Sequence, residues 1–67
     1  MLRRPWLRHL SGGDVSSIIA RPDRKERQEE DGRLRVWGYA RSVERYIRLV
    51  IEPDGRTVHN AMEDDPP

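Results

Sequence analysis

Residues 33–61 read RLRVWGYARSVERYIRLVIEPDGRTVHNA, and this stretch decides the fold. Apolar residues alternate with polar or aromatic ones over 33–40 and again over 45–52, which is the period of a strand with one buried face. The sequence 53–55, Pro-Asp-Gly, is a strong hairpin signal. Residues 56–61 read as one more strand, so we predict a three-stranded antiparallel meander.

The alternation also assigns the two faces of this sheet. If Ala40 pairs with Arg45 across the first turn, the large aliphatic side chains of both strands fall on one face. We expect that face to form the core of the domain, from Leu34, Val36, Ile47, Leu49 and Ile51.

Residues 1–22 predict one or two short helices. Ser11 is a candidate N-cap, and Val15, Ile18 and Ile19 follow with the i, i+3, i+4 spacing of an apolar helix stripe. Pro22 ends this helix, because the residue before a proline is pushed out of the helical region. Trp6, Leu7 and Leu10 have a spacing that suits a further short helix. The sequence therefore predicts an α+β fold in which helices cover one sheet face.

Length and composition limit the remaining possibilities. The chain has 67 residues, which allows one small domain, and only 34% are hydrophobic while 37% are charged. The stretch 23–32 contains no large apolar residue and predicts a charged loop, and 62–67 predicts a frayed acidic tail. We expect a single domain over residues 1–67.

Several classes of site are not expected from this sequence. The absence of cysteine excludes disulfides and cysteine-ligated zinc, and the two histidines are far apart, so we predict no metal site and no cofactor. No apolar run is long enough to span a membrane, and no signal peptide precedes the domain. The expectation is a soluble, cytoplasmic protein.

Charge is segregated along the chain although the formal net charge is only +1. The basic segments 1–25 and 32–58 alternate with the acidic segments 26–31 and 59–67. All but one of the 13 basic residues are arginine, whose planar fork suits phosphate. A GC-rich coding sequence is an equally simple explanation of the arginine content.

The second face of the predicted sheet interleaves arginines with three aromatic rings. Such a surface stacks unpaired bases and holds phosphates, and the candidate RNA-binding residues are Arg35, Trp37, Tyr39, Arg41 and Tyr46. The structural alternative is that Tyr39–Tyr46 and Trp37–Arg48 are cross-strand pairs that stabilise the sheet.

His59 is the candidate proton-transfer residue. One register of the second hairpin places it opposite Leu49 on the core face, and the other places it opposite Val50, beside the arginines. On the arginine side it could act near neutral pH as an acid or base. With Arg33 and Arg48 as charge stabilisers, His59 completes the set of candidate catalytic residues.

The order of short motifs along the chain resembles that of BrnT-type toxins, small proteins of the wider RelE/ParE-like group. The motifs span about residues 9–61 and comprise Asp14-Val15, Ile18-Ile19, Pro22, Asp31-Gly32-Arg33, Trp37-Gly38, Ile47-Arg48-Leu49-Val50, Asp54-Gly55 and Val58-His59-Asn60-Ala61. The resemblance implies a helical N-terminus packed on an antiparallel sheet, ribonuclease activity that arrests translation, and a neutralising antitoxin. Arg33, Arg48 and His59 match basic or polar positions of the family pattern.

The leading hypothesis is therefore a toxin-like RNA-binding protein that acts as a metal-independent ribonuclease. The alternative is a non-catalytic module that binds another protein, either an inactive toxin relative or a small phage or accessory protein. In that case the acidic stretch 26–31 and the acidic tail would belong to the interface. The placement of His59 discriminates between the two, because exposure beside the arginines favours the enzyme and burial favours the module.

Overall fold

The two alternating stretches pair as predicted. In a computed structural model, which describes residues 5–67, they form β2 (Leu34–Ala40) and β3 (Arg45–Ile51). The strands are antiparallel, with Leu34 opposite Ile51 and Ala40 opposite Arg45, which is the expected register. The predicted division into an aliphatic face and an arginine-rich face therefore holds for this hairpin.

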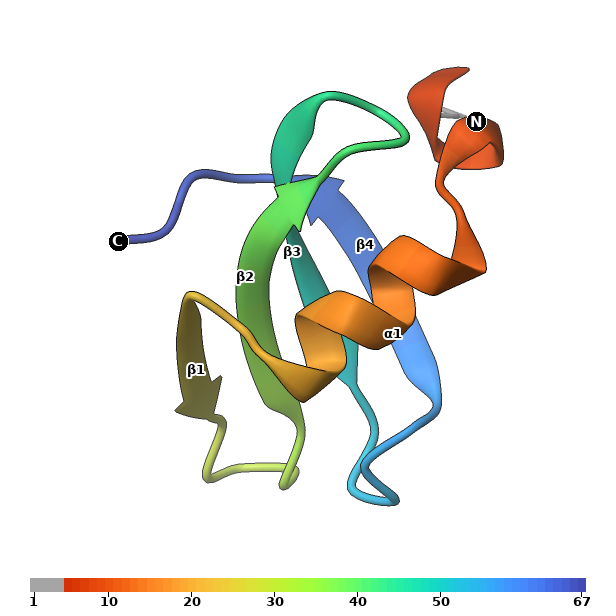
Figure 1. Cartoon of the computed structure of the whole chain (residues 1–67). Coiled ribbons are helices and arrows are strands. Elements are labelled where there is room, and N and C mark those ends of the chain that lie inside the picture. Colours follow the sequence, from red (N-terminus) through yellow and green to blue (C-terminus); the bar gives the residue numbers. More distant parts are fainter. Residues whose placement is uncertain (1–4) are drawn as a thin grey trace.

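The sheet has four strands, not three. The strand β1 (Arg24–Arg27) pairs with β2, and the strand β4 (Val58–Glu63) pairs with β3. All neighbouring strands are antiparallel, and their order is β1-β2-β3-β4. The α+β class is correct, and the sheet is one strand wider than the sequence predicted (Figure 1).

The interpretation of residues 23–32 as a loop is wrong over β1. Backbone hydrogen bonds hold this strand to β2, and two more flank it, from Asp23 N to Trp37 O (2.8 Å) and from Gln28 N to Arg33 O (2.7 Å). An edge strand needs backbone pairing on one side only, and charged side chains are the usual protection of such an edge. Lack of apolar side chains therefore did not exclude a strand here.

The helical predictions are confirmed within the described residues. A 3₁₀-helix, η1 (Pro5–His9), precedes α1 (Gly12–Ala20), and the first four residues of the predicted helical segment lie outside the described range. The Ser11 hydroxyl accepts from the Asp14 N–H at 3.0 Å, so Ser11 is the N-cap of α1.

One face of the sheet packs against α1 and η1 and contains the core. Its buried residues are Ile18, Val36, Ala40, Val43, Ile47, Leu49, Ile51 and Ala61. α1 crosses β2 closely because Gly38 has no side chain: a Cβ atom there would lie 2.8 Å from Ile18 Cγ1. The start of α1 is also fastened to the β2–β3 turn, since Ser42 N donates to Asp14 Oδ2 at 2.7 Å.

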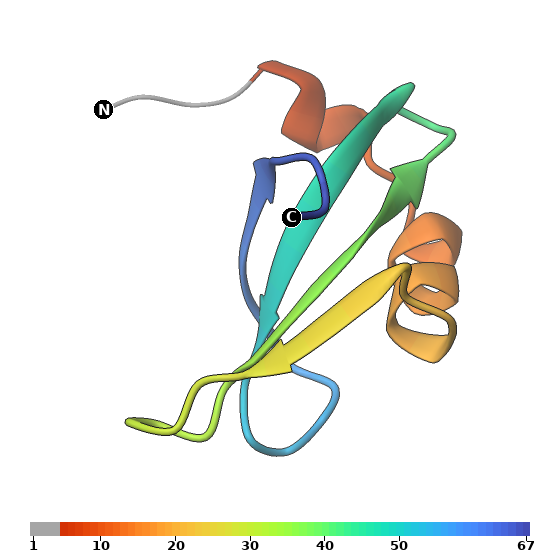
Figure 2. The ribbon, with the colours of Figure 1, turned by 90° about the vertical axis from the view of Figure 1, so that its left-hand side faces the viewer.

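The acidic tail is more ordered than the sequence suggested. Glu63 ends β4 instead of fraying, and the N–H of Asp64 donates to the carbonyl of Tyr46 at 3.1 Å. Beyond β4 the chain turns back over the sheet on the side away from α1 (Figures 1 and 2). The two sheet faces are therefore covered differently, one by helices and the other in part by the tail.

Within residues 5–67, no helix combines the length and the apolar character that a membrane crossing requires.

Gly38→Ala should destabilise the domain by about 1–3 kcal/mol, because the added methyl group overpacks the α1–β2 contact. The matched control is Gly12→Ala, since a Cβ atom at Gly12 meets nothing within 4 Å. Chemical denaturation of both variants measures the free energy of unfolding. Equal stability of the two would show that α1 does not depend on this close approach.

Candidate functional site

The face turned away from α1 carries most of the candidate site residues, and we call it the arginine face. Alternation along β2 and β3 places them in successive rows across the sheet. From one end of the strands to the other, the rows hold Arg33, Glu52 and His59; then Glu26, Arg35, Val50 and Asn60; then Arg24, Trp37, Arg48 and Met62; and finally Tyr39 and Tyr46.

At one end of this face, Glu52 joins two of the predicted catalytic residues. Its Oε1 accepts from Arg33 Nε at 3.0 Å, and its Oε2 lies 2.9 Å from His59 Nδ1. Arg33 is also paired with Asp31, at 3.3 Å. The hydrogen bond to Glu52 raises the pKa of the Arg33 guanidinium, which remains charged. We refer to Arg33, Glu52 and His59 as the Glu52 cluster.

The turn between β3 and β4 delivers His59 to this cluster. The Asp54 carboxylate accepts from the N–H of Arg56 and of Thr57, both at 2.8 Å, and from the Thr57 hydroxyl. The turn is closed by the N–H of Glu52 donating to the Thr57 carbonyl at 2.8 Å. Pro-Asp-Gly thus makes the turn that the sequence predicted, and it fixes both partners of the Glu52–His59 contact.

The position of His59 agrees with neither predicted register. Ala61 lies opposite Leu49 and Asn60 opposite Val50, while a bulge between Val50 and Ile51 leaves His59 as the additional residue. Bulges redirect side chains in this way. The imidazole is 47% exposed and lies beside Glu52, on the same side as Arg33. His59 is therefore exposed beside Arg33 and is not buried in the core.

Arg48 is not brought to the Glu52 cluster. It lies four residues from Glu52 along β3, or about 13 Å at the usual rise per residue. Its guanidinium contacts the Met62 sulfur and lies 3.6 Å from Asp64 Oδ2. The guanidinium is thus held beside Met62 and Asp64 and not at the Glu52 cluster, so Arg48 is suited to a different phosphate from the one at His59.

Trp37 does not provide the accessible stacking platform that the sequence predicted. The residue is only 3% exposed, and its indole N–H donates to Asp64 Oδ2 at 3.0 Å. Trp37 lies between Arg24 and Arg48 of the two neighbouring strands, and Asp64, which was expected to belong to a frayed tail, bonds to its ring.

Two tyrosines remain accessible as aromatic contacts. Tyr39 and Tyr46 pair edge to face across β2 and β3, with ring centroids 5.2 Å apart, and are 47% and 39% exposed. Arg35 lies on the same face, partly buried. Arg41 stands apart, in the turn between β2 and β3, where its charge lies near Asp14 at the start of α1.

Two residues of this site were missed by sequence reasoning. Glu52 was read only as the end of a strand, yet Arg33 and Glu52 follow from the Leu34–Ile51 pair by extending the register by one residue. That extension was available from the sequence. Asp64 had no such signal, because its place opposite Tyr46 depends on the register of β4 against β3, which the bulge sets.

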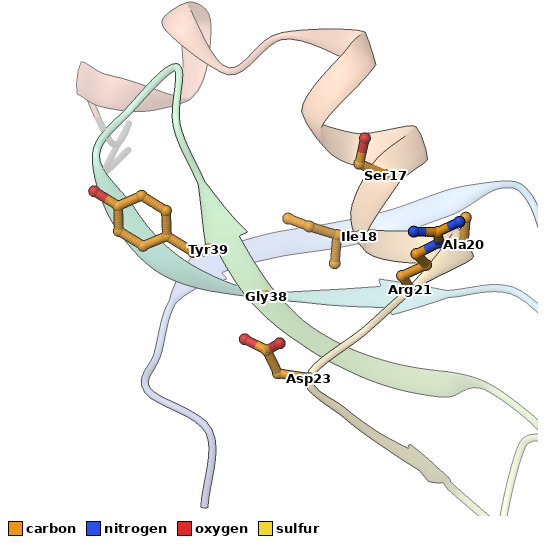
Figure 3. A pocket seen from close by; sticks show the side chains of 7 residues that line it. All are labelled: Ser17, Ile18, Ala20, Arg21, Asp23, Gly38 and Tyr39. Atoms are coloured by element: carbon orange, nitrogen blue, oxygen red, sulfur yellow. The ribbon is translucent and has the colours of Figure 1, made fainter.

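A hollow lies elsewhere in the described part of the chain, between α1 and β2. It is open, has a volume of about 400 Å³, and is lined by Ser17, Ile18, Ala20, Arg21, Asp23, Gly38 and Tyr39 (Figure 3). It contains none of the Glu52 cluster.

Neither a protein-family model nor a curated protein nor a solved structure shows significant similarity to this chain.

Asp54→Ala should destabilise the domain at pH values above 3.8, the ordinary carboxyl pKa, and much less in strong acid. The hydrogen bonds from Thr57, first of all, and from Arg56 lower the pKa of Asp54 to about 2. A lowered pKa in the folded state contributes stability that is lost as pH falls through that value. Urea unfolding from about pH 5 to about pH 2 measures the gap between wild type and variant. A gap that stays constant to pH 2 would contradict the assigned role of the carboxylate.

Proposed function

We propose that this chain is a toxin-like protein that binds single-stranded RNA and cleaves it without a metal ion. The observation that carries the proposal is the Glu52 cluster, in which one carboxylate is bonded to an arginine and to an exposed histidine on the arginine face. Such a constellation contains the groups that phosphodiester cleavage requires: a proton acceptor, a proton donor and a fixed positive charge.

In this reaction the 2′-hydroxyl of the RNA attacks the adjacent phosphorus and the 5′-oxygen leaves. With Nδ1 bonded to Glu52, the neutral His59 ring presents Nε2 as the acceptor. His59 Nε2 takes the 2′-hydroxyl proton, and the Glu52 carboxylate stabilises the imidazolium that forms. Proton return from the imidazolium to the leaving oxygen completes the step. Arg33 supplies positive charge beside the phosphate as negative charge accumulates on its oxygens.

The rest of the arginine face supports binding of the strand. Arg35 and Arg48 continue the line of positive charge along the sheet from Arg33, and the exposed Tyr39 and Tyr46 rings lie at its far end. Single-stranded nucleic acid is bound in this way, by cations along the backbone and by rings that stack on bases.

The resemblance to BrnT-type toxins adds a partner to the proposal. Under that resemblance an antitoxin neutralises the chain by binding it, and covering the arginine face would achieve this directly. The alternative function, a non-catalytic interaction module, is favoured by a different feature. Within residues 5–67 the edge strand β1 has no neighbouring strand on one side, and Glu29, Glu30 and Asp31 beside it are exposed, as an acidic interface would require.

RNA cleavage by the purified protein in the presence of EDTA tests the proposal. His59→Ala should lower the rate about 10²–10⁴-fold, the usual contribution of a general acid–base residue. Glu52→Gln should lower it less, because the amide still contacts the ring but no longer stabilises the imidazolium. The matched histidine control is His9→Ala, since His9 is exposed on η1 and contacts only Arg8 among the interactions of its side chain that the structure describes.

Products that end in a 2′,3′-cyclic phosphate are expected, and RNA with a 2′-deoxy substitution at the cleaved position should be resistant. Equal rates for His59→Ala and His9→Ala would overturn the assignment of the site. RNA binding without any cleavage by the wild type would remove the catalytic part of the proposal, and absence of both binding and cleavage would support the module.

Binding should separate into a stacking part and an ionic part. Tyr39→Ala should weaken binding of a single-stranded oligonucleotide by about 1–3 kcal/mol at every salt concentration, whereas Tyr39→Phe keeps the ring and serves as its control. Arg48→Ala should reduce the slope of log K against log salt by about 0.7, the value of one phosphate contact. Fluorescence anisotropy over a salt series measures both. Equal weakening by the Phe and Ala variants would exclude stacking.

A further inference from the structure

Two donors on the arginine face converge on one carboxylate oxygen of the tail. Asp64 Oδ2 accepts from Trp37 Nε1 at 3.0 Å and lies 3.6 Å from Arg48 Nη1. Trp37 is almost fully buried, so its indole N–H is held in a fixed direction by the packing around the ring. Trp37 and Arg48 face each other across β2 and β3. Together they form an anion seat, defined by the Trp37 N–H and the Arg48 guanidinium.

The seat lies among donors that Asp64 does not satisfy. The Nε atoms of Arg35 and Arg48 are buried and have no hydrogen-bond partner within the described part of the chain. Buried donors of this kind are costly to leave unpaired. A single carboxylate offers two oxygens, whereas a phosphodiester in an RNA strand brings further oxygens and a second phosphate within reach of the same surface.

Asp64 reaches the arginine face because it extends the pairing of β4 with β3 by one residue, to a position opposite Tyr46. Its N–H is bonded to the Tyr46 carbonyl at 3.1 Å, and the preceding Glu63 is 3.5 Å from Arg45. The Asp64 side chain is 40% exposed, and ion pairs of this exposure contribute little to stability because water and salt screen them. Another anion can replace the carboxylate at little cost only if it also accepts the hydrogen bond from the buried Trp37 N–H, and a phosphate oxygen can do so.

We propose that the anion seat is a phosphate-binding subsite for the RNA backbone, and that Asp64 occupies it as an internal competitor that the incoming phosphate displaces. This inference rests on the proposed RNA-binding function. It assigns a phosphate further along the strand than the cleaved one to Trp37 and Arg48, and it makes the acidic tail an autoinhibitory segment. The tail lowers affinity for RNA and favours strands that can offer several phosphates at once.

Binding of a 2′-O-methyl oligouridylate, which cannot be cleaved, tests the inference in the full-length chain. Asp64→Asn removes the competing charge but keeps the backbone bond to Tyr46, and Asp65→Asn makes the same charge change at an exposed neighbour. If the docked tail leaves the seat open in about a tenth of the wild-type molecules, Asp64→Asn should lower the apparent dissociation constant for the oligonucleotide on the order of tenfold. Equal affinities of the two variants would overturn the inference.

The indole N–H resonance of Trp37 provides a second measurement that does not depend on the variants folding equally well. In the wild type it should shift as the oligouridylate is added, while the indole of Trp6, on η1, serves as the internal reference. An unchanged Trp37 resonance under saturating oligonucleotide would show that Asp64 is not displaced, and would reject the proposal.

Inorganic tripolyphosphate separates this inference from the proposed function. It should shift the Trp37 resonance of Asp64→Asn at lower concentration than that of the wild type. A shift with tripolyphosphate but no binding of the oligonucleotide rejects RNA as the ligand and retains the anion seat. Cleavage of RNA without any effect at Trp37 retains the nuclease and removes the seat.

Discussion

The register of β2 against β3 is the constraint on which the rest of the molecule depends. Seven residue pairs fix it, from Leu34–Ile51 to Ala40–Arg45. Because side chains alternate, this one register places the aliphatic residues under α1 and the arginines on the opposite face. A shift of one strand against the other by one residue would move the side chains of that strand to the opposite face. The close passage of α1 over Gly38 and the contact between Arg33 and Glu52 both follow from the same alignment.

The arginine face shows how a nearly neutral chain can present local positive charge. Carboxylates hold its cations in place at several points: Glu52 and Asp31 contact Arg33, Glu26 contacts Arg24, and Asp64 contacts Arg48. These pairs are partly exposed and contribute modestly to stability. Their main effect is to orient the guanidinium groups. At Glu52 the same carboxylate also orients His59, and this shared partner turns two separate side chains into one candidate site.

Much of the sheet and of α1 could be predicted because those segments bury apolar side chains in a fixed period. The register of β2 with β3 and the Ser11 cap needed only alternation and capping chemistry. The strand β1 could not be predicted in this way, since only its backbone is bonded and its side chains carry no apolar pattern. No local pattern predicts the bulge that redirects His59. The hydrogen bond between Asp64 and Trp37 likewise depends on the tertiary structure. The sequence therefore left the face of His59 open between two registers, and Trp37 was predicted to be accessible but is buried.

A chemical-shift map of the ¹⁵N-labelled protein with a non-cleavable 2′-O-methyl RNA tests the central claim most directly, because it asks which face of the sheet meets the ligand. We expect perturbed resonances along the arginine face, at Arg33, Glu52 and His59 and around Tyr39 and Tyr46. The resonances of Ser16 and Ser17, which are exposed on α1, should be unchanged. Perturbation confined to the α1 side, or no perturbation at low salt, would contradict it.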